Sequence, residues 1–245
     1  MTNKYMYFIA NWKMFGDINS LNSLDKVIKF IKSFKKKKLT KIIYCPPNTL
    51  INLMSKKLKN TNINVGSQNC HEQKDYGPYT GSVNCKMLKN VGAKYVIIGH
   101  SENRSSGETD KLINLKIKSA LKSGLKIIFC VGETLSEKRK KITKKILHRQ
   151  IKLGLNKIKK KNKIMIAYEP VWSIGTGHIP KPKDLLNTVN FIKKQFNNQK
   201  ILYGGSVNSK NISLLNSINN IDGFLIGGAS QDPKKFIDII KKTIN

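Results

Sequence analysis

The chain has 245 residues, with 46 Lys or Arg against 14 Asp or Glu, which gives a formal net charge of +32 at pH 7. Its hydrophobic content of 39% is sufficient for a folded core, and it has no run of about 18 apolar residues that could span a membrane. The length suits one α/β domain, and no linker or low-complexity tract divides the chain.

Short apolar segments recur along the chain and predict parallel strands that are buried on both faces. In chain order they cover residues 5–11, 41–46, 63–68, 94–100, 126–133, 163–169, 200–205 and 222–228. Amphipathic patterns between them predict helices over 20–34, 49–58, 82–90, 109–122, 137–158, 183–196, 209–216 and 233–243. Strands that alternate with helices in a chain of about 250 residues predict a (β/α)8 barrel of the α/β class. We expect residues 1–245 to form it as a single domain.

Polar side chains follow several of the predicted strands at their carboxyl ends. They are Asn11, Lys13, His100, Glu102, Glu133 and Glu169. The first two are two residues apart, so both point to the same side of an extended chain. In a barrel of this class the chemistry lies at the carboxyl ends of the strands, so we expect these groups to converge there.

Three of these residues, together with glycines after the last two strands, indicate a reaction. Glu169 ends an apolar strand, where burial raises the pKa of a carboxyl group toward that of a general base. His100 precedes the segment SENR, and if that segment is a helix its dipole favours a neutral imidazole. Lys13 supplies a positive charge, and glycines after the last two strands leave backbone N–H groups open to a phosphate. The set fits proton abstraction beside a carbonyl of a small phosphate ester, although each residue alone also fits an ordinary structural role.

Ordered motifs then connect the chain to a family. They are NWKM (11–14), GHSENR (99–104), CVGETL (130–135), AYEPVWSIGTG (167–177), YGGSV (203–207) and GGAS (227–230). In this order, over nearly the whole chain, they resemble the triosephosphate isomerase family. The resemblance implies interconversion of dihydroxyacetone phosphate and D-glyceraldehyde 3-phosphate through an enediolate, in glycolysis and gluconeogenesis, without a metal or cofactor.

The resemblance also assigns roles. Glu169 would be the base that moves the proton, and neutral His100 would polarise the carbonyl group. Lys13 would hold the phosphate charge with Asn11 beside it, and Glu102 would support both Lys13 and His100. Backbone contacts to the phosphate would come from Gly175, Ser206, Gly227 and Gly228.

Residues 171–180 would form the closing lid of the family, which excludes water from the reaction. In the family, the position of Pro180 donates a backbone N–H to the tyrosine hydroxyl of the YGGS motif, here Tyr203. Proline has no N–H. We therefore expect a less firmly closed lid in this chain.

The segment DYGPYTGSV (75–83) resembles the dimer loop of the family and implies a homodimer. Thr80 would reach toward the partner subunit's Asn11. Ser82 stands where the family has Glu, and Asn103 stands where it has Arg, and in the family these two charges pair across the interface. Because both are missing, no charge is left unpaired, and we expect an intact interface with altered polar contacts.

The sequence leaves two alternative functions to consider. One is a different barrel enzyme that acts on another small sugar phosphate. The other is a polyanion-binding protein on a barrel scaffold, which the net charge of +32 suggests. Arginine occurs only at Arg104, Arg139 and Arg149, whereas nucleic-acid readers use arginine for bidentate contacts. We favour lysines on solvated helix faces and expect no specific nucleic-acid partner.

The cysteines are dispersed without a C-x-x-C pair, which favours reduced thiols over a disulfide framework or a zinc site. The apolar run near the start is shorter than a signal peptide requires. We therefore expect a cytoplasmic protein with no membrane partner.

Overall fold

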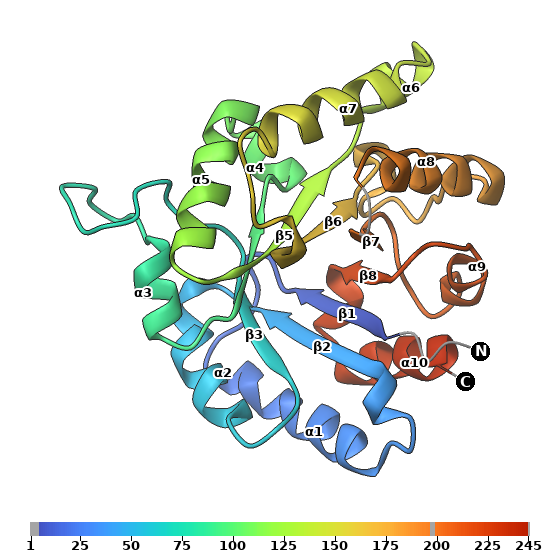
Figure 1. Cartoon of the computed structure of the whole chain (residues 1–245). Coiled ribbons are helices and arrows are strands. Elements are labelled where there is room, and N and C mark those ends of the chain that lie inside the picture. The colour runs from blue at the N-terminus through green and yellow to red at the C-terminus, as the bar shows by residue number, and fades with distance from the viewer. Residues whose placement is uncertain (1–4, 197–198, 245) are drawn as a thin grey trace.

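The protein is described by a computed structural model that covers residues 5–196 and 199–244. Within these residues, parallel strands form a closed barrel and follow one another around it in chain order (Figure 1). They are β1 (Met6–Asn11), β2 (Thr40–Cys45), β3 (Asn64–Ser67), β4 (Tyr95–Ile98), β5 (Lys126–Val131), β6 (Ile164–Tyr168), β7 (Lys200–Tyr203) and β8 (Gly223–Ile226). Strand β1 pairs with both β2 and β8, which closes the ring and confirms the predicted barrel.

Helices surround the barrel on its outside (Figure 1). They are α1 (Leu24–Ser33), α2 (Ile51–Leu58), α3 (Cys85–Asn90), α4 (Ser101–Ser105), α5 (Asp110–Lys122), α6 (Leu135–Arg139), α7 (Thr143–Gly154), α8 (Pro182–Gln195), α9 (Ile212–Asn216) and α10 (Pro233–Ile244). No helix in the described part of the chain has both the length and the apolar character needed to cross a membrane.

The prediction of one continuous helix over residues 137–158 is wrong. The pattern over 137–158 is divided in the structure into α6 and α7. Helix α6 begins early, because Thr134 and Glu137 form a capping box at its N-terminus. It ends before Lys141, whose φ of 57° is left-handed and incompatible with a continuing helix.

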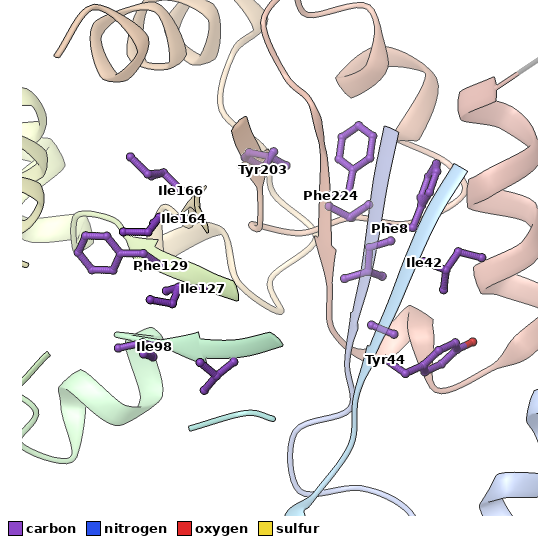
Figure 2. Close-up of a cluster of buried hydrophobic side chains, with 14 of the residues drawn as sticks. Phe8, Ile42, Tyr44, Ile98, Ile127, Phe129, Ile164, Ile166, Tyr203 and Phe224 are labelled. Carbon is purple, nitrogen blue, oxygen red and sulfur yellow. The ribbon is translucent and has the colours of Figure 1, made fainter. Parts of the chain in front are cut away.

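The strands are buried on both faces, as continuous apolar segments require. Alternate side chains point in opposite directions, so Ile9 lies in the cluster inside the barrel whereas Phe8 lies in the layer between strands and helices. Figure 2 shows part of that outer layer, with Phe8, Phe129 and Phe224 on three different strands. Apolar packing inside the barrel leaves its carboxyl-end mouth as the place where polar groups gather.

Candidate active site

The end of β1 places Asn11 and Lys13 at the mouth of the barrel. The buried Asn11 side chain accepts the Lys13 backbone N–H over 3.1 Å, and Lys13 adopts a left-handed φ of 55°. Such a conformation is uncommon for a residue with a side chain and is concentrated at functional sites. The Lys13 ammonium lies 2.5 Å from Glu102 Oε1. Gln68, which the sequence did not single out, donates to the Lys13 carbonyl oxygen over 2.8 Å and holds this turn in place.

His100 is the N-cap residue of α4, so the segment SENR is indeed helical. Its Nδ1 accepts the Glu102 backbone N–H over 3.3 Å. An imidazole nitrogen that accepts a hydrogen bond carries no proton, so the proton of the neutral ring is on Nε2. That Nε2 lies 3.6 Å from Glu169 Oε1. The ring therefore presents a hydrogen-bond donor toward the carboxylate and the cavity.

Glu169 follows β6 and is buried, with 3% of its surface exposed. Within the part of the chain that the structure describes, its Oε2 has no hydrogen-bond partner. Burial raises the pKa of Glu169 above its ordinary value, while His100, the Cys130 thiol and Lys13 act in the opposite direction. The contact with Cys130 was not predicted from the sequence. The result is a carboxyl group that is a stronger base than an exposed one.

Two glycines make room for Glu169, one for its side chain and one for its backbone. A Cβ on Gly204 would lie 2.6 Å from Glu169 Cγ and 2.9 Å from its Oε1. A Cβ on Gly132 would lie 1.8 Å from the Glu169 carbonyl oxygen. Neither position can carry a side chain unless Glu169 moves.

A cavity of about 330 Å³ joins most of the groups that the sequence singled out. Its lining includes Asn11, Lys13, His100, Glu169, Gly175, Ser206, Gly227 and Gly228. A Cβ on Gly228 would meet nothing within 4 Å, so core packing does not explain that glycine.

A second cavity of about 280 Å³ shares Asn11, Lys13 and His100 with the first. Glu102 and Asn103 also line it. Glu102 lines the second cavity and not the first, and it is bonded to the Lys13 ammonium and lies 3.6 Å from His100 Nδ1. Thr80 lies elsewhere, on an exposed loop of the same chain.

The segment 171–180 begins beside another buried carboxylate, Glu133. The sequence placed Glu133 at a strand end without a role, and the structure shows it accepting from Trp172 Nε1 over 2.9 Å and from the Tyr168 hydroxyl over 3.1 Å. The Lys138 ammonium lies 3.2 Å from the centre of the Trp172 ring. Burial raises the pKa of Glu133, and its hydrogen bonds act against that rise. These contacts hold Trp172, near the start of that segment, in place.

Comparison with known proteins gives a consistent result. The family model described as triosephosphate isomerase matches residues 6–243. A triosephosphate isomerase of Dictyoglomus thermophilum is 43% identical over 95% of this chain and 97% of its own length. One of Aquifex aeolicus is 39% identical over 94% of this chain and 96% of its own. The crystal structure of triosephosphate isomerase from Bartonella henselae superposes with a TM-score of 0.87 and 36% identity, covering 97% of this chain and 98% of that one.

Proposed function

Because the chain belongs to the triosephosphate isomerase family, we propose that Glu169, His100 and Lys13 are the groups with which it acts. Its reaction is the interconversion of dihydroxyacetone phosphate and D-glyceraldehyde 3-phosphate, a step of glycolysis. The proposal treats residues 1–245 as one catalytic domain. It adds to the family assignment the roles of particular atoms.

Glu169 takes the proton from the carbon next to the substrate carbonyl. The electrons of the broken C–H bond move toward the carbonyl oxygen and form an enediolate. The same carboxyl group then returns the proton to the neighbouring carbon, while the hydroxyl proton on the first carbon passes to the former carbonyl oxygen, so that the carbonyl group forms again on the first carbon. The raised pKa of Glu169 supports this role, since proton transfer is most effective when the pKa of the base lies near the working pH. His100 donates from Nε2 to the oxygens that gain charge.

The phosphate lies at the other end of the cavity, against backbone N–H groups. The residues proposed to supply them are Gly175, Ser206, Gly227 and Gly228, all of which line the cavity. Lys13 adds the positive charge, and Asn11 and Glu102 hold it in position through the contacts described above. Closure of residues 171–180 excludes water and strengthens these electrostatic contacts.

One observation carries the proposal: Glu169 Oε1 and His100 Nε2 lie 3.6 Å apart, and both line one cavity of about 330 Å³. A three-carbon ligand can therefore contact both groups at once. In Glu169→Asp the carboxylate retracts by roughly one C–C bond, about 1.5 Å. A displacement of that size costs about 100-fold in turnover when the reacting groups must be closely aligned.

The measurement is a coupled isomerase assay on purified wild type and Glu169→Asp. Glu137→Asp is the matched control, since Glu137 caps α6 and does not line the cavity. The control should keep wild-type turnover, and both variants should keep the wild-type circular dichroism spectrum. Turnover of a folded Glu169→Asp within a few-fold of wild type would show that Glu169 is not the base.

The proposal includes a homodimer in the cytoplasm. Residues 75–83 project from the barrel beside α3 (Figure 1), and Tyr76 and Tyr79 on this loop are 63% and 42% exposed. Met14, which lines the second cavity, is 100% exposed. Exposed apolar side chains of this size favour a partner surface, and Thr80 on this loop would enter the second cavity of the other subunit. Sedimentation that shows only monomer at micromolar concentration would refute this part.

A further inference from the structure

Two buried cysteines lie at the two ends of the loop that carries residues 75–83. They are Cys70, shortly after β3, and Cys85, the first residue of α3. The His71 N–H donates to the Val83 carbonyl oxygen over 2.9 Å, so the two ends of the loop lie side by side. The Cys70 thiol donates a hydrogen bond to the Cys85 thiol, and both are free thiols in this structure. The proposed reaction uses neither of these nucleophilic groups.

The surroundings of the pair are those of a reactive thiol. The hydrogen bond between them lowers the pKa of Cys85, against the effect of burial, and raises the pKa of Cys70 together with burial. The Lys116 ammonium, which is buried and paired with Glu108, favours the thiolate form of both cysteines. Loss of one proton from the pair therefore gives a thiolate on Cys85 that a thiol and a cation stabilise. Thiolates beside a cation are the cysteines that react with oxidants.

A cavity of about 230 Å³ leads to this pair. Cys70 lines it together with Gly81 and Ser82, which are exposed, so the cavity opens to solvent. Since a water molecule occupies about 30 Å³, a small hydroperoxide fits beside Cys70. The other two cysteines, Cys45 and Cys130, lie in the cluster inside the barrel, where burial raises the pKa of both. They provide an internal comparison for the reactivity of the pair.

We propose that Cys70 and Cys85 form an oxidation site, at which a small hydroperoxide converts the two thiols into a disulfide bond. The Cys70 sulfur faces the cavity. It passes its proton to the Cys85 thiolate along their hydrogen bond and attacks the terminal oxygen of the hydroperoxide. A sulfur–oxygen bond forms and the oxygen–oxygen bond breaks. The departing alkoxide or hydroxide ion takes up from solvent the proton that the pair had lost.

The second step involves only the two cysteines. The Cys85 sulfur attacks the sulfenic acid on Cys70, so that a sulfur–sulfur bond forms and the sulfur–oxygen bond breaks. The departing hydroxide leaves as water with the proton of Cys85. Together the two sulfur atoms lose two electrons, and the hydroperoxide gains them.

The product is a covalent ring that closes the loop at its base. A disulfide bond is about 2.05 Å long, so it holds the two ends of the loop more closely than a hydrogen bond between thiols does. A cross-link that fits the native geometry stabilises the folded state by restricting the unfolded chain. Oxidised protein should therefore resist urea better than reduced protein. In a reducing compartment, disulfides of this transient kind are typically redox-sensing. The inference does not depend on the proposed function.

The test treats purified, reduced protein with a small excess of hydrogen peroxide. The thiol count should fall from four to two per chain, and it should return to four after reduction with dithiothreitol. Mass spectrometry of an unreduced digest should show Cys70 joined to Cys85. The urea midpoint should rise on oxidation and fall back on reduction. Cys70→Ala should form no disulfide and show no such rise, whereas the matched control Cys45→Ala should respond as wild type does.

Several results would overturn the proposal. One is a thiol count that peroxide leaves unchanged in the folded wild type. Others are oxidation of Cys70 or Cys85 without a cross-link between them, and loss of the Cys45 and Cys130 thiols at the same rate as the pair. If Cys70→Ala does not fold, Cys85→Ala replaces it with the same expectation. The digest of wild type decides without any variant, because it identifies the joined residues directly.

Discussion

Replacing Glu169 by Gln should make the protein more stable and inactive. Glu169 is 3% exposed, and its Oε2 has no hydrogen-bond partner among the described residues. A buried polar group without a partner costs about 1–3 kcal/mol, and more when it is charged. Gln keeps the shape of the side chain and removes the charge. The Gln amide is still polar at the unpartnered position, so only the part of the cost that the charge adds is recovered. The free energy of unfolding should therefore rise by about 1 kcal/mol, or about 2–4 °C in Tm for a chain of this length.

The gain should depend on pH. Burial raises the pKa of Glu169 in the folded protein above its ordinary value of 4.5. The folded state therefore holds its proton more tightly than the unfolded state, and stability is lost as pH rises from 4.5 through the folded pKa. As pH rises through the folded pKa the wild type bears an increasing penalty, so the stability advantage of Glu169→Gln should grow with pH. Below the unfolded pKa the two proteins should converge.

The assay is urea unfolding at fixed protein concentration, because association contributes to apparent stability. Glu133→Gln is the matched control. Glu133 is as buried as Glu169, but its two oxygens accept from Trp172 and Tyr168. Bonds to a charged group contribute about 1.5–3 kcal/mol, so Glu133→Gln should gain nothing. The reasoning is refuted if Glu169→Gln is no more stable than wild type at pH 8, or if Glu133→Gln gains as much.

Three other changes have expected outcomes. Pro180→Ala restores a backbone N–H that can donate one hydrogen bond, worth about 1 kcal/mol. That bond should raise turnover, or reduce loss of phosphate from the enediolate, by about fivefold. The measurements are the isomerase rate and the amount of free phosphate released. If the ratio of isomerase rate to phosphate release does not change, Pro180 does not weaken closure of the lid. Ser82→Glu alone should raise the dissociation constant of the dimer, measured by sedimentation, and adding Asn103→Arg should restore it. If the effects of the two substitutions are additive, these positions do not pair. With a net charge of +32, kcat/KM for the anionic substrate should fall several-fold as salt rises and the Debye length shrinks from about 30 Å to 8 Å. A flat salt profile would mean that the net charge does not steer the substrate.

The strands and the main site residues were predictable because they follow local rules. Strands buried on both faces must be apolar throughout, and a polar residue at the end of such a segment is conspicuous. His100 and Glu169 are of this kind, and both line the same cavity. The division of 137–158 was not predictable, since its break depends on a left-handed Lys141 with no glycine or proline to mark it.

The supporting contacts were also missed, for a different reason. Gln68 holds the Lys13 carbonyl oxygen from 55 residues away, and Ser173 meets Tyr203 from 30 residues away. Such pairs have no periodicity, and only the closed barrel brings them together. The polyanion-binding alternative rested on net charge alone, which informs on partners and solubility but not on the chemistry of a site.

The strictest demands on this sequence fall on two positions that contribute no functional group. An alanine at Gly132 or Gly204 would leave every reactive atom in the chain and still push the Glu169 backbone or carboxylate out of line. At Gly204 the clash is with the Glu169 side chain, so the damage would fall first on the position of the carboxylate. At Gly132 the clash is with the Glu169 backbone, so the damage would reach the fold as well as the rate.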